Sequence, residues 1–209
     1  RERMPNAKGF DSFYGTLGGN DSGRIRMYEN NEPAGETEDM GGLTRLYTDK
    51  ALTFLRAQRD RPFFLYVAHT MVHSIVGASA EFRGKSRGGL YGDAVEELDF
   101  HSGRLLDALG RLGLRERTYV IFMSDNGGLS TSEGHPTSNL PLRAGKGWPY
   151  EGGTRVAWLV SAPGITKPGT TCDTPVISTD YYPTLLQLAG LPAKPAQHRD
   201  GVSLLPQLK

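Results

Sequence analysis

Residues 118–128 read TYVIFMSDNGG, an apolar run followed at once by serine, aspartate, asparagine and two glycines. A short, continuous apolar run of this kind is typical of a strand that is buried on both faces, as in a parallel sheet. The runs at 63–68 (FFLYVA) and 156–160 (VAWLV) have the same character. Together, the three runs predict one mostly parallel sheet.

Helical periodicity separates these runs and predicts helices at about 44–58, 92–112 and 182–190. In the second helix the apolar positions fall on one face: Val95, Leu98, Leu105, Leu109 and Leu112. Alternation of strands and helices predicts an α/β fold with helices on both faces of the sheet. Residues 1–42 are rich in glycine, asparagine and acidic residues, which predicts long surface loops.

The bulk properties exclude several classes of protein. A length of 209 residues suits one domain or most of one, and a formal net charge of +1 gives no basis for binding nucleic acid. No window reaches the roughly 18 consecutive apolar residues of a membrane span. The single cysteine, Cys172, excludes an internal disulfide and any site with several cysteine ligands.

Asp125 and Asn126 directly follow a predicted strand, the position at which open α/β sheets bind ligands. Carboxylate and amide oxygens are hard donors that suit Ca²⁺ or Mg²⁺. Adjacent strand side chains point to opposite faces, so both can reach one ion only where the chain turns, which Gly127 and Gly128 permit. The same residues are common in ordinary turns, and alone they leave a metal site and a simple turn both open.

Two further residues are candidates for catalysis. Lys146 lies between two glycines, which allow close approach of a ligand, and its ammonium suits a tetrahedral oxyanion. His73 follows the predicted strand 63–68 and can donate a proton to a leaving alcohol. His69, four residues earlier, competes for that role. Taken singly, each is also explained as a solvated or structural residue.

Residues 127–155 form a stretch with hardly any apolar periodicity, and loops of that length within a domain are usually functional. Within it, His135 and Arg143 are candidates for binding a substrate. Glu133 and Asn139 are also able to touch a sugar. A purely structural role remains open for each of the four.

Six segments, in order along the chain, resemble motifs of the type I sulfatases, which belong to the alkaline-phosphatase superfamily. They are KGFDSFYG at 8–15, PFFLY at 62–66 with the histidine that follows it, SDNG at 124–127, GKG and EGGTRV within 145–156, DYYPTL at 180–185, and DGVSLL at 200–205. The resemblance implies an alkaline-phosphatase-like fold and identifies residues 1–209 as an internal and C-terminal part of the catalytic domain.

The resemblance also implies roles for individual residues. Asp125 and Asn126 correspond to two ligands of a calcium ion that holds a sulfate oxygen. Lys146 corresponds to a residue that contacts the sulfate ester and offsets charge in the transition state. His73 corresponds to the residue at the ester oxygen that helps the alcohol to leave. The implied full-length enzyme hydrolyses a small-molecule or glycan sulfate ester, in a periplasmic, secreted or lysosome-like compartment.

The family's nucleophile is a formylglycine, made from a cysteine or serine that opens a C/S-x-P/A-x-R motif. Cys172 is followed by DTPVI, which lacks this motif, and no serine of the chain fits it. We therefore expect the nucleophile, the remaining calcium ligands and a small C-terminal subdomain to lie outside 1–209. On this expectation, the chain alone is inactive.

Two other functions compete with this prediction. Phosphatases and phosphodiesterases of the superfamily hold two zinc ions and have Asp-His where this chain has Asp125-Asn126. Because an amide oxygen suits calcium and imidazole suits zinc, the asparagine favours a sulfatase. A non-catalytic binder of sulfated ligands is the third possibility, and half of a calcium site argues against it because calcium takes six to eight oxygens.

Overall fold

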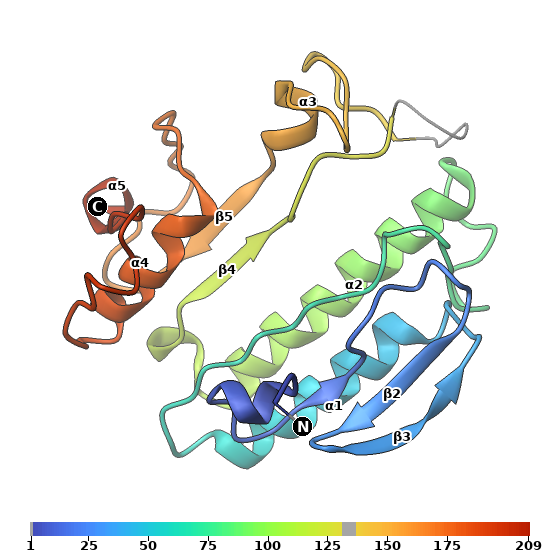
Figure 1. Cartoon of the computed structure of the whole chain (residues 1–209), viewed down its shortest axis with the longest axis horizontal. Coiled ribbons are helices and arrows are strands. Elements are labelled where there is room, and N and C mark those ends of the chain that lie inside the picture. The colour runs from blue at the N-terminus through green and yellow to red at the C-terminus, as the bar shows by residue number, and fades with distance from the viewer. Residues whose placement is uncertain (1, 131–136) are drawn as a thin grey trace.

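The computed structural model describes residues 2–130 and 137–209, which form an α/β structure (Figure 1). Its α-helices are α1 (Leu43–Gln58), α2 (Gly89–Arg111), α3 (Glu151–Thr154), α4 (Tyr181–Leu188) and α5 (Leu205–Leu208). Its strands are β1 (Tyr14–Gly15), β2 (Ile25–Glu29), β3 (Glu32–Thr37), β4 (Val120–Met123) and β5 (Trp158–Ser161). Short 3₁₀ turns lie at Pro5–Lys8, Arg115–Arg117 and Ser178–Asp180.

The three predicted helices are confirmed as α1, α2 and α4, each within a few residues of the expected bounds. The end of α2 follows from its sequence, because Gly113 adopts a φ of +67° directly after the last turn. That left-handed conformation is costly for residues with a Cβ, and glycine after a helix end is its usual place. None of the described helices is long and apolar enough to cross a membrane.

The N-terminal region corrects one prediction, because residues 1–42 contain an antiparallel sheet in the order β1-β2-β3 rather than only loops. In β2, Ile25 and Met27 face inward and pack with Leu43 and Tyr47 of α1. Only these two residues of β2 are apolar and buried, which is too few for a recognisable strand pattern in the sequence. The neighbouring β3 has the sequence EPAGET and is almost wholly exposed. Its hydropathy therefore did not predict a strand.

The predicted mostly parallel sheet of three strands is also wrong within this chain. β4 and β5 pair antiparallel, with Val120 opposite Ser161 and Met123 opposite Trp158. Among the described residues, no backbone hydrogen bond joins 63–68 to another strand. An apolar run predicts extended, covered backbone, and it carries no information on which strand will be its partner or in which direction they pair.

Segment 63–68 nevertheless has the side-chain alternation of a strand with one covered face. Phe63 and Leu65 pack on the cluster formed by Leu55, Leu109 and Leu114, whereas Phe64 and Tyr66 are 58% and 68% exposed. The expected burial on both faces is therefore not found here. One face is covered by the helices, and the other is open in this chain.

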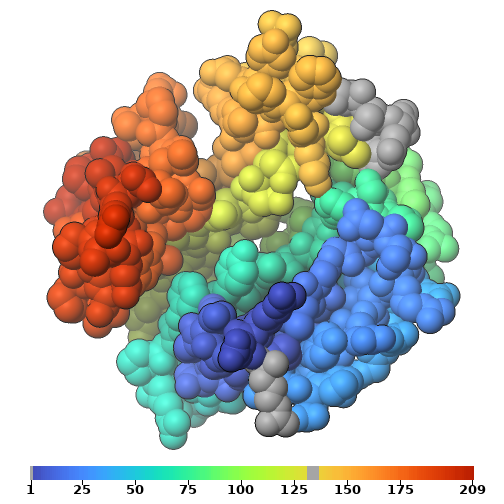
Figure 2. All heavy atoms as spheres, in the orientation of Figure 1, coloured from blue at the N-terminus to red at the C-terminus, as the bar shows by residue number. Residues whose placement is uncertain are grey.

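Segment 63–68 and β4 share this cluster, since Val120 packs on it too. In Figure 1 the segment after α1 and strand β4 both run from lower left to upper right. The loops that follow these two segments therefore leave toward the same side of the molecule. Between the two, the surface in Figure 2 is hollowed.

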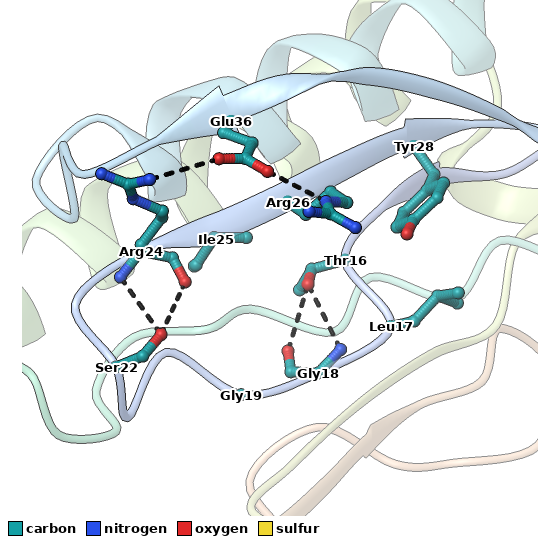
Figure 3. Close-up of a pocket in the computed structure, with 10 residues that line it drawn as sticks. All are labelled: Thr16, Leu17, Gly18, Gly19, Ser22, Arg24, Ile25, Arg26, Tyr28 and Glu36. Carbon is teal, nitrogen blue, oxygen red and sulfur yellow. Dashed lines mark hydrogen bonds and ion pairs between the residues drawn. The ribbon is translucent and has the colours of Figure 1, made fainter.

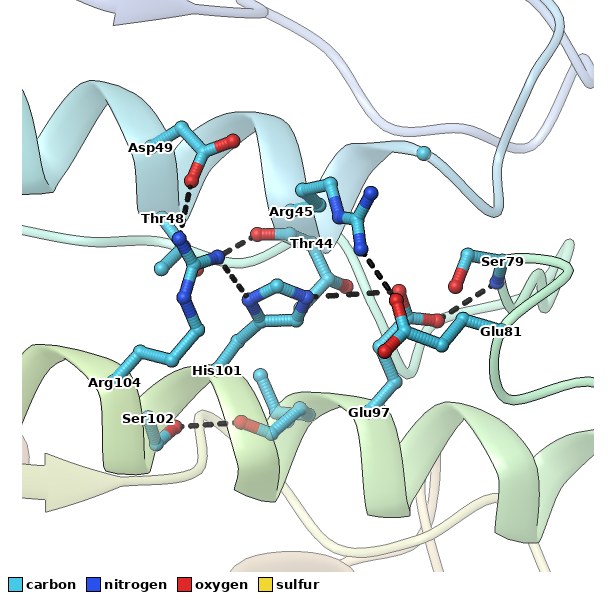
Figure 4. Close-up of polar contacts among 12 residues, drawn as sticks. Thr44, Arg45, Thr48, Asp49, Ser79, Glu81, Glu97, His101, Ser102 and Arg104 are labelled. Carbon is cyan, nitrogen blue, oxygen red and sulfur yellow. Dashed lines mark hydrogen bonds and ion pairs between the residues drawn. The ribbon is translucent and has the colours of Figure 1, made fainter. Parts of the chain in front are cut away.

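Leu109 of the predicted apolar face packs on Leu55 of α1, as expected, but another part of the buried face of α2 is polar, which the periodicity did not predict. Glu97 and His101 are 1% and 0% exposed, with 3.7 Å between a carboxylate oxygen and Nε2 (Figure 4). Arg104 reaches from α2 to Asp49 of α1 at 2.8 Å and also contacts Nδ1 of His101. By contrast, Val95 of the predicted apolar face is 40% exposed. A buried polar stripe therefore joins the two helices.

Candidate active site

The segment that carries Asp125 and Asn126 leaves β4 in a tight turn fixed by backbone contacts. Ser124 Oγ donates to the carbonyl of Asn126 at 2.9 Å, and the Gly127 N–H donates to the carbonyl of Gly153 at 3.0 Å. A Cβ at Gly127 would lie 1.8 Å from the carbonyl oxygen of Gly152. Glycine is therefore required here for close backbone approach.

The segment that carries Lys146 is held against the same turn. The Lys146 N–H donates to the carbonyl of Gly128 at 3.0 Å, and a Cβ at Gly145 would meet that carbonyl oxygen at 2.3 Å. Asn139 joins the two segments, because its Oδ1 accepts from the Gly128 N–H at 3.0 Å while its Nδ2 donates to the carbonyls of Gly128 and Ala144. The structure thus brings 125–128 and Lys146 together.

The side chains at this turn are available to a ligand. Among the described residues, no hydrogen bond or ion pair engages the side chains of Asp125, Asn126 or Lys146. Asp125 is exposed and Asn126 half-buried, and both offer hard oxygens at the end of a strand. These donors fit one part of a calcium coordination sphere. Residues 2–130 and 137–209 contain no group of three or more His, Cys, Asp or Glu side chains placed to hold a metal.

His73 lies in the loop after segment 63–68, with its side chain 40% exposed. Its Nδ1 lies 3.1 Å from Asn20 Oδ1 and 2.5 Å from the Ser74 carbonyl oxygen, so Nε2 is the ring nitrogen left for a substrate. Asn20 was not singled out in the sequence, because GGND has the composition of an ordinary turn. Convergence of His73 with Asp125 and Lys146 stays a prediction.

His69 has a different environment from His73. Its ring packs near Tyr47, with 6.3 Å between ring centroids, and its buried Nδ1 has no hydrogen-bond partner among the described residues. Burial, and to a smaller extent the nearby His101, lowers the pKa of His69 to about 4. His69 is therefore neutral at pH 7 and faces the helices of the core.

The structure gives different environments to the loop residues that were candidates for substrate binding. The guanidinium carbon of Arg143 lies 3.7 Å from the centroid of the Tyr150 ring, and Trp148 stacks nearly parallel to Tyr150 with 6.5 Å between centroids. This arginine–aromatic group flanks Lys146 on both sides in the sequence. Asn139 is structural, as its bonds to Gly128 and Ala144 show. The other two candidates, Glu133 and His135, lie outside the described residues.

A family model described as Sulfatase matches residues 1–191. The chain belongs to the sulfatase family. Among curated relatives, this sulfatase chain is 42% identical to steryl-sulfatase of Mus musculus over 82% of its own length. It is 40% identical to N-acetylgalactosamine-6-sulfatase of Mus musculus over 88% of its length.

A solved structure has the same fold as the sulfatase chain. The crystal structure of Ps i-CgsB in complex with k-i-k-neocarrahexaose superposes with a TM-score of 0.86 at 30% sequence identity. The match covers 98% of this chain and 51% of that one. An alkaline-phosphatase-like α/β fold is thereby confirmed, although the strand pairing within this chain differs from the prediction. The chain spans 28% and 36% of the two curated relatives.

Proposed function

We propose that the full-length protein containing this chain hydrolyses sulfate esters to an alcohol and sulfate. The observation that carries the proposal is the joined pair of segments 124–128 and 143–147. Backbone hydrogen bonds and Asn139 hold them together, and they carry three polar side chains that no other described residue engages: Asp125, Asn126 and Lys146. A carboxylate, an amide oxygen and an ammonium group suit a bound cation beside a sulfate.

In this proposal, Asp125 and Asn126 would hold a calcium ion, which would supply positive charge beside the sulfate group. Lys146 adds a second positive charge, which offsets the negative charge that grows on the sulfate group as the bond to the alcohol breaks. His73 gives a proton to the departing alcohol oxygen, which makes it a better leaving group. A formylglycine supplies the nucleophile, and no C/S-x-P/A-x-R motif for making it occurs in residues 1–209.

We further propose that the substrate is a sulfated saccharide. Trp148 is 51% exposed, and its indole face and the adjacent Tyr150 ring give an apolar platform beside Lys146. Arg143 adds a cation next to this platform, which suits a second anionic group on a sugar. The complex of the structurally similar Ps i-CgsB with k-i-k-neocarrahexaose supports a saccharide over a simple aryl sulfate.

The test uses the full-length protein, produced together with a formylglycine-generating enzyme and assayed with calcium. Lys146→Ala should lower kcat about 100- to 1000-fold, the range seen when one charge-stabilising donor is removed from an active site. His73→Ala should lower kcat about 100-fold, because one general acid is lost. Lys167→Ala is the matched control, since that lysine is exposed in a different loop. Activity that survives both site substitutions unchanged contradicts the proposal.

The substrate class is tested with the same protein on sulfated oligosaccharides, a steryl sulfate and an aryl sulfate. A saccharide substrate predicts that Trp148→Ala raises KM for the oligosaccharide several-fold and leaves the aryl sulfate almost unaffected. Equal losses on all three substrates, or a preference for the steryl sulfate, would show that the aromatic platform has been assigned to the wrong ligand.

A further inference from the structure

Asn20 is a fully buried polar residue, 0% exposed, whose side chain reaches a loop more than fifty residues later. Its Nδ2 donates to the carbonyl of Ile75 at 2.8 Å and, over a longer 3.4 Å, to the carbonyl of His73. Its Oδ1 lies 3.1 Å from Nδ1 of the His73 ring. One buried amide therefore holds both the backbone and the ring of the proposed catalytic histidine.

These contacts fix the orientation of the amide. Nδ2 faces two carbonyl oxygens, which can only accept hydrogen bonds, so Oδ1 must be the atom that faces the His73 ring. The reverse orientation would place Oδ1 against both carbonyls and leave the buried Nδ2 hydrogens without those acceptors, which is costly. The geometry therefore presents an acceptor to Nδ1.

The Ser74 carbonyl oxygen, 2.5 Å from Nδ1 of His73, is a second acceptor at the same ring nitrogen. Two acceptors around one nitrogen require that this nitrogen carry the hydrogen. The neutral ring is therefore the Nδ1–H tautomer, with the lone pair on Nε2. A carboxylate oxygen of Asp21 lies on the same side of the ring, 3.9 Å from Nδ1.

We propose that Asn20 is a positioning residue that holds His73 as the Nδ1–H tautomer and directs Nε2 to the ester oxygen. The inference rests on the proposed function of His73. After Nε2 takes up a proton, that proton passes to the alcohol oxygen as its bond to sulfur breaks. The electron pair of the broken bond stays on that oxygen, and the ring returns to the neutral Nδ1–H form.

The loop around Asn20 is braced for such a role. Figure 3 shows Thr16 Oγ1 bonded to both the N–H and the carbonyl of Gly18, and Ser22 Oγ bonded to both backbone groups of Arg24. These two turns flank Asn20 on either side and close one wall of a shallow pocket. These local hydrogen bonds hold the loop independently of the histidine, so the Asn20 amide is a fixed partner for the ring.

The test compares Asn20→Leu and Asn20→Asp with His73→Ala in the full-length protein. Asn20→Leu removes the acceptor and should lower kcat about 10- to 100-fold with little change in KM, as expected when a histidine loses its orienting partner. Asn20→Asp keeps an acceptor at Nδ1, so the ring should stay in the Nδ1–H tautomer, but its second oxygen meets the Ile75 carbonyl in place of a donor, and a loss of stability is expected.

Two controls separate positioning from simple loss of stability. Thr48→Val removes the hydrogen bond from Oγ1 of an equally buried residue to the Thr44 carbonyl within α1, and it should leave kcat and the His73 tautomer unchanged. The double variant Asn20→Leu/His73→Ala should be no slower than His73→Ala alone, because Asn20 acts through the histidine. Additive losses would overturn the inference.

The tautomer is read directly from ¹⁵N chemical shifts of histidine-labelled protein, with the His73 signals assigned by their loss in His73→Gln. An Nδ1–H ring in the wild type supports the inference, and an Nε2–H ring overturns it whatever the activities. If His73→Ala retains full activity, the proposed function of His73 fails while the tautomer is still decided. If His73→Ala is inactive and folded Asn20→Leu is fully active, only the role of Asn20 fails.

Discussion

Replacing His69 by glutamine should remove a large part of the acid sensitivity of this protein. The His69 ring is largely buried near Tyr47, and its Nδ1 has no partner among the described residues. Burial lowers its pKa from 6.5 to about 4, with a smaller contribution from His101. Between these two values the unfolded chain binds a proton that the folded chain does not, so stability falls as the pH falls.

The magnitude follows from the size of the shift. A difference of about 2.5 pKa units at about 1.36 kcal/mol each gives a maximum cost of about 3 kcal/mol below pH 4. At pH 5, where the unfolded state is almost fully protonated and the folded state is not, the cost is about 2 kcal/mol. At pH 7.5 it is close to zero, since the ring is neutral in both states.

The assay is urea denaturation of the wild type and of His69→Gln at a series of pH values from 7.5 to 5. The free energy of unfolding of the wild type should fall by about 2 kcal/mol more than that of the variant over this range. Other titrating groups are common to both proteins and cancel in the difference. Parallel pH dependence of the two proteins would show that His69 titrates normally and that the burial argument is wrong.

Two further substitutions test close packing and a buried carboxylate. Gly127→Ala places a Cβ 1.8 Å from a carbonyl oxygen and should cost about 3 kcal/mol or more in thermal or urea unfolding, whereas Gly103→Ala, in open space on α2, should be neutral or stabilising by up to about 1 kcal/mol. Equal effects of the two would refute the packing argument. Asp180→Ala leaves the N–H groups of Ile177 and Val202 without their acceptor and should cost about 2–4 kcal/mol; a loss below about 0.5 kcal/mol would show that water replaces the carboxylate.

The helices were predictable because their signals are local. Apolar spacing located α1, α2 and α4, and a glycine just past the last turn marked the ends of α2 and α4. These signals arise from residues that are close together in the sequence, so they can be read from the sequence alone. The same reasoning missed Glu97 and His101, since a buried polar pair is stable only through partners on another helix.

The pairing of the strands could not be predicted from local sequence signals. The runs at 118–123 and 156–160 were recognised as extended, yet their antiparallel pairing was not, and 63–68 has no partner strand among the described residues. Pairing depends on backbone groups that all residues share, so composition does not encode the partner. For β3 even the extended state was hidden, because its side chains are exposed and carry no apolar alternation.

For the active site, the sequence by itself determined the family and supplied the side chains that we propose to act on a sulfate ester. It did so because carboxylate, amide, ammonium and imidazole groups have fixed chemistry wherever they lie. Only the tertiary structure decided how they are supported. Asn139 had been left open between touching a sugar and a structural role, and it joins Gly128 to Ala144, while Asn20, one polar residue in an ordinary-looking turn, holds His73. An amide has the same hydrogen-bonding groups in every setting, and its role is set by the distant atoms that folding brings within about 3 Å.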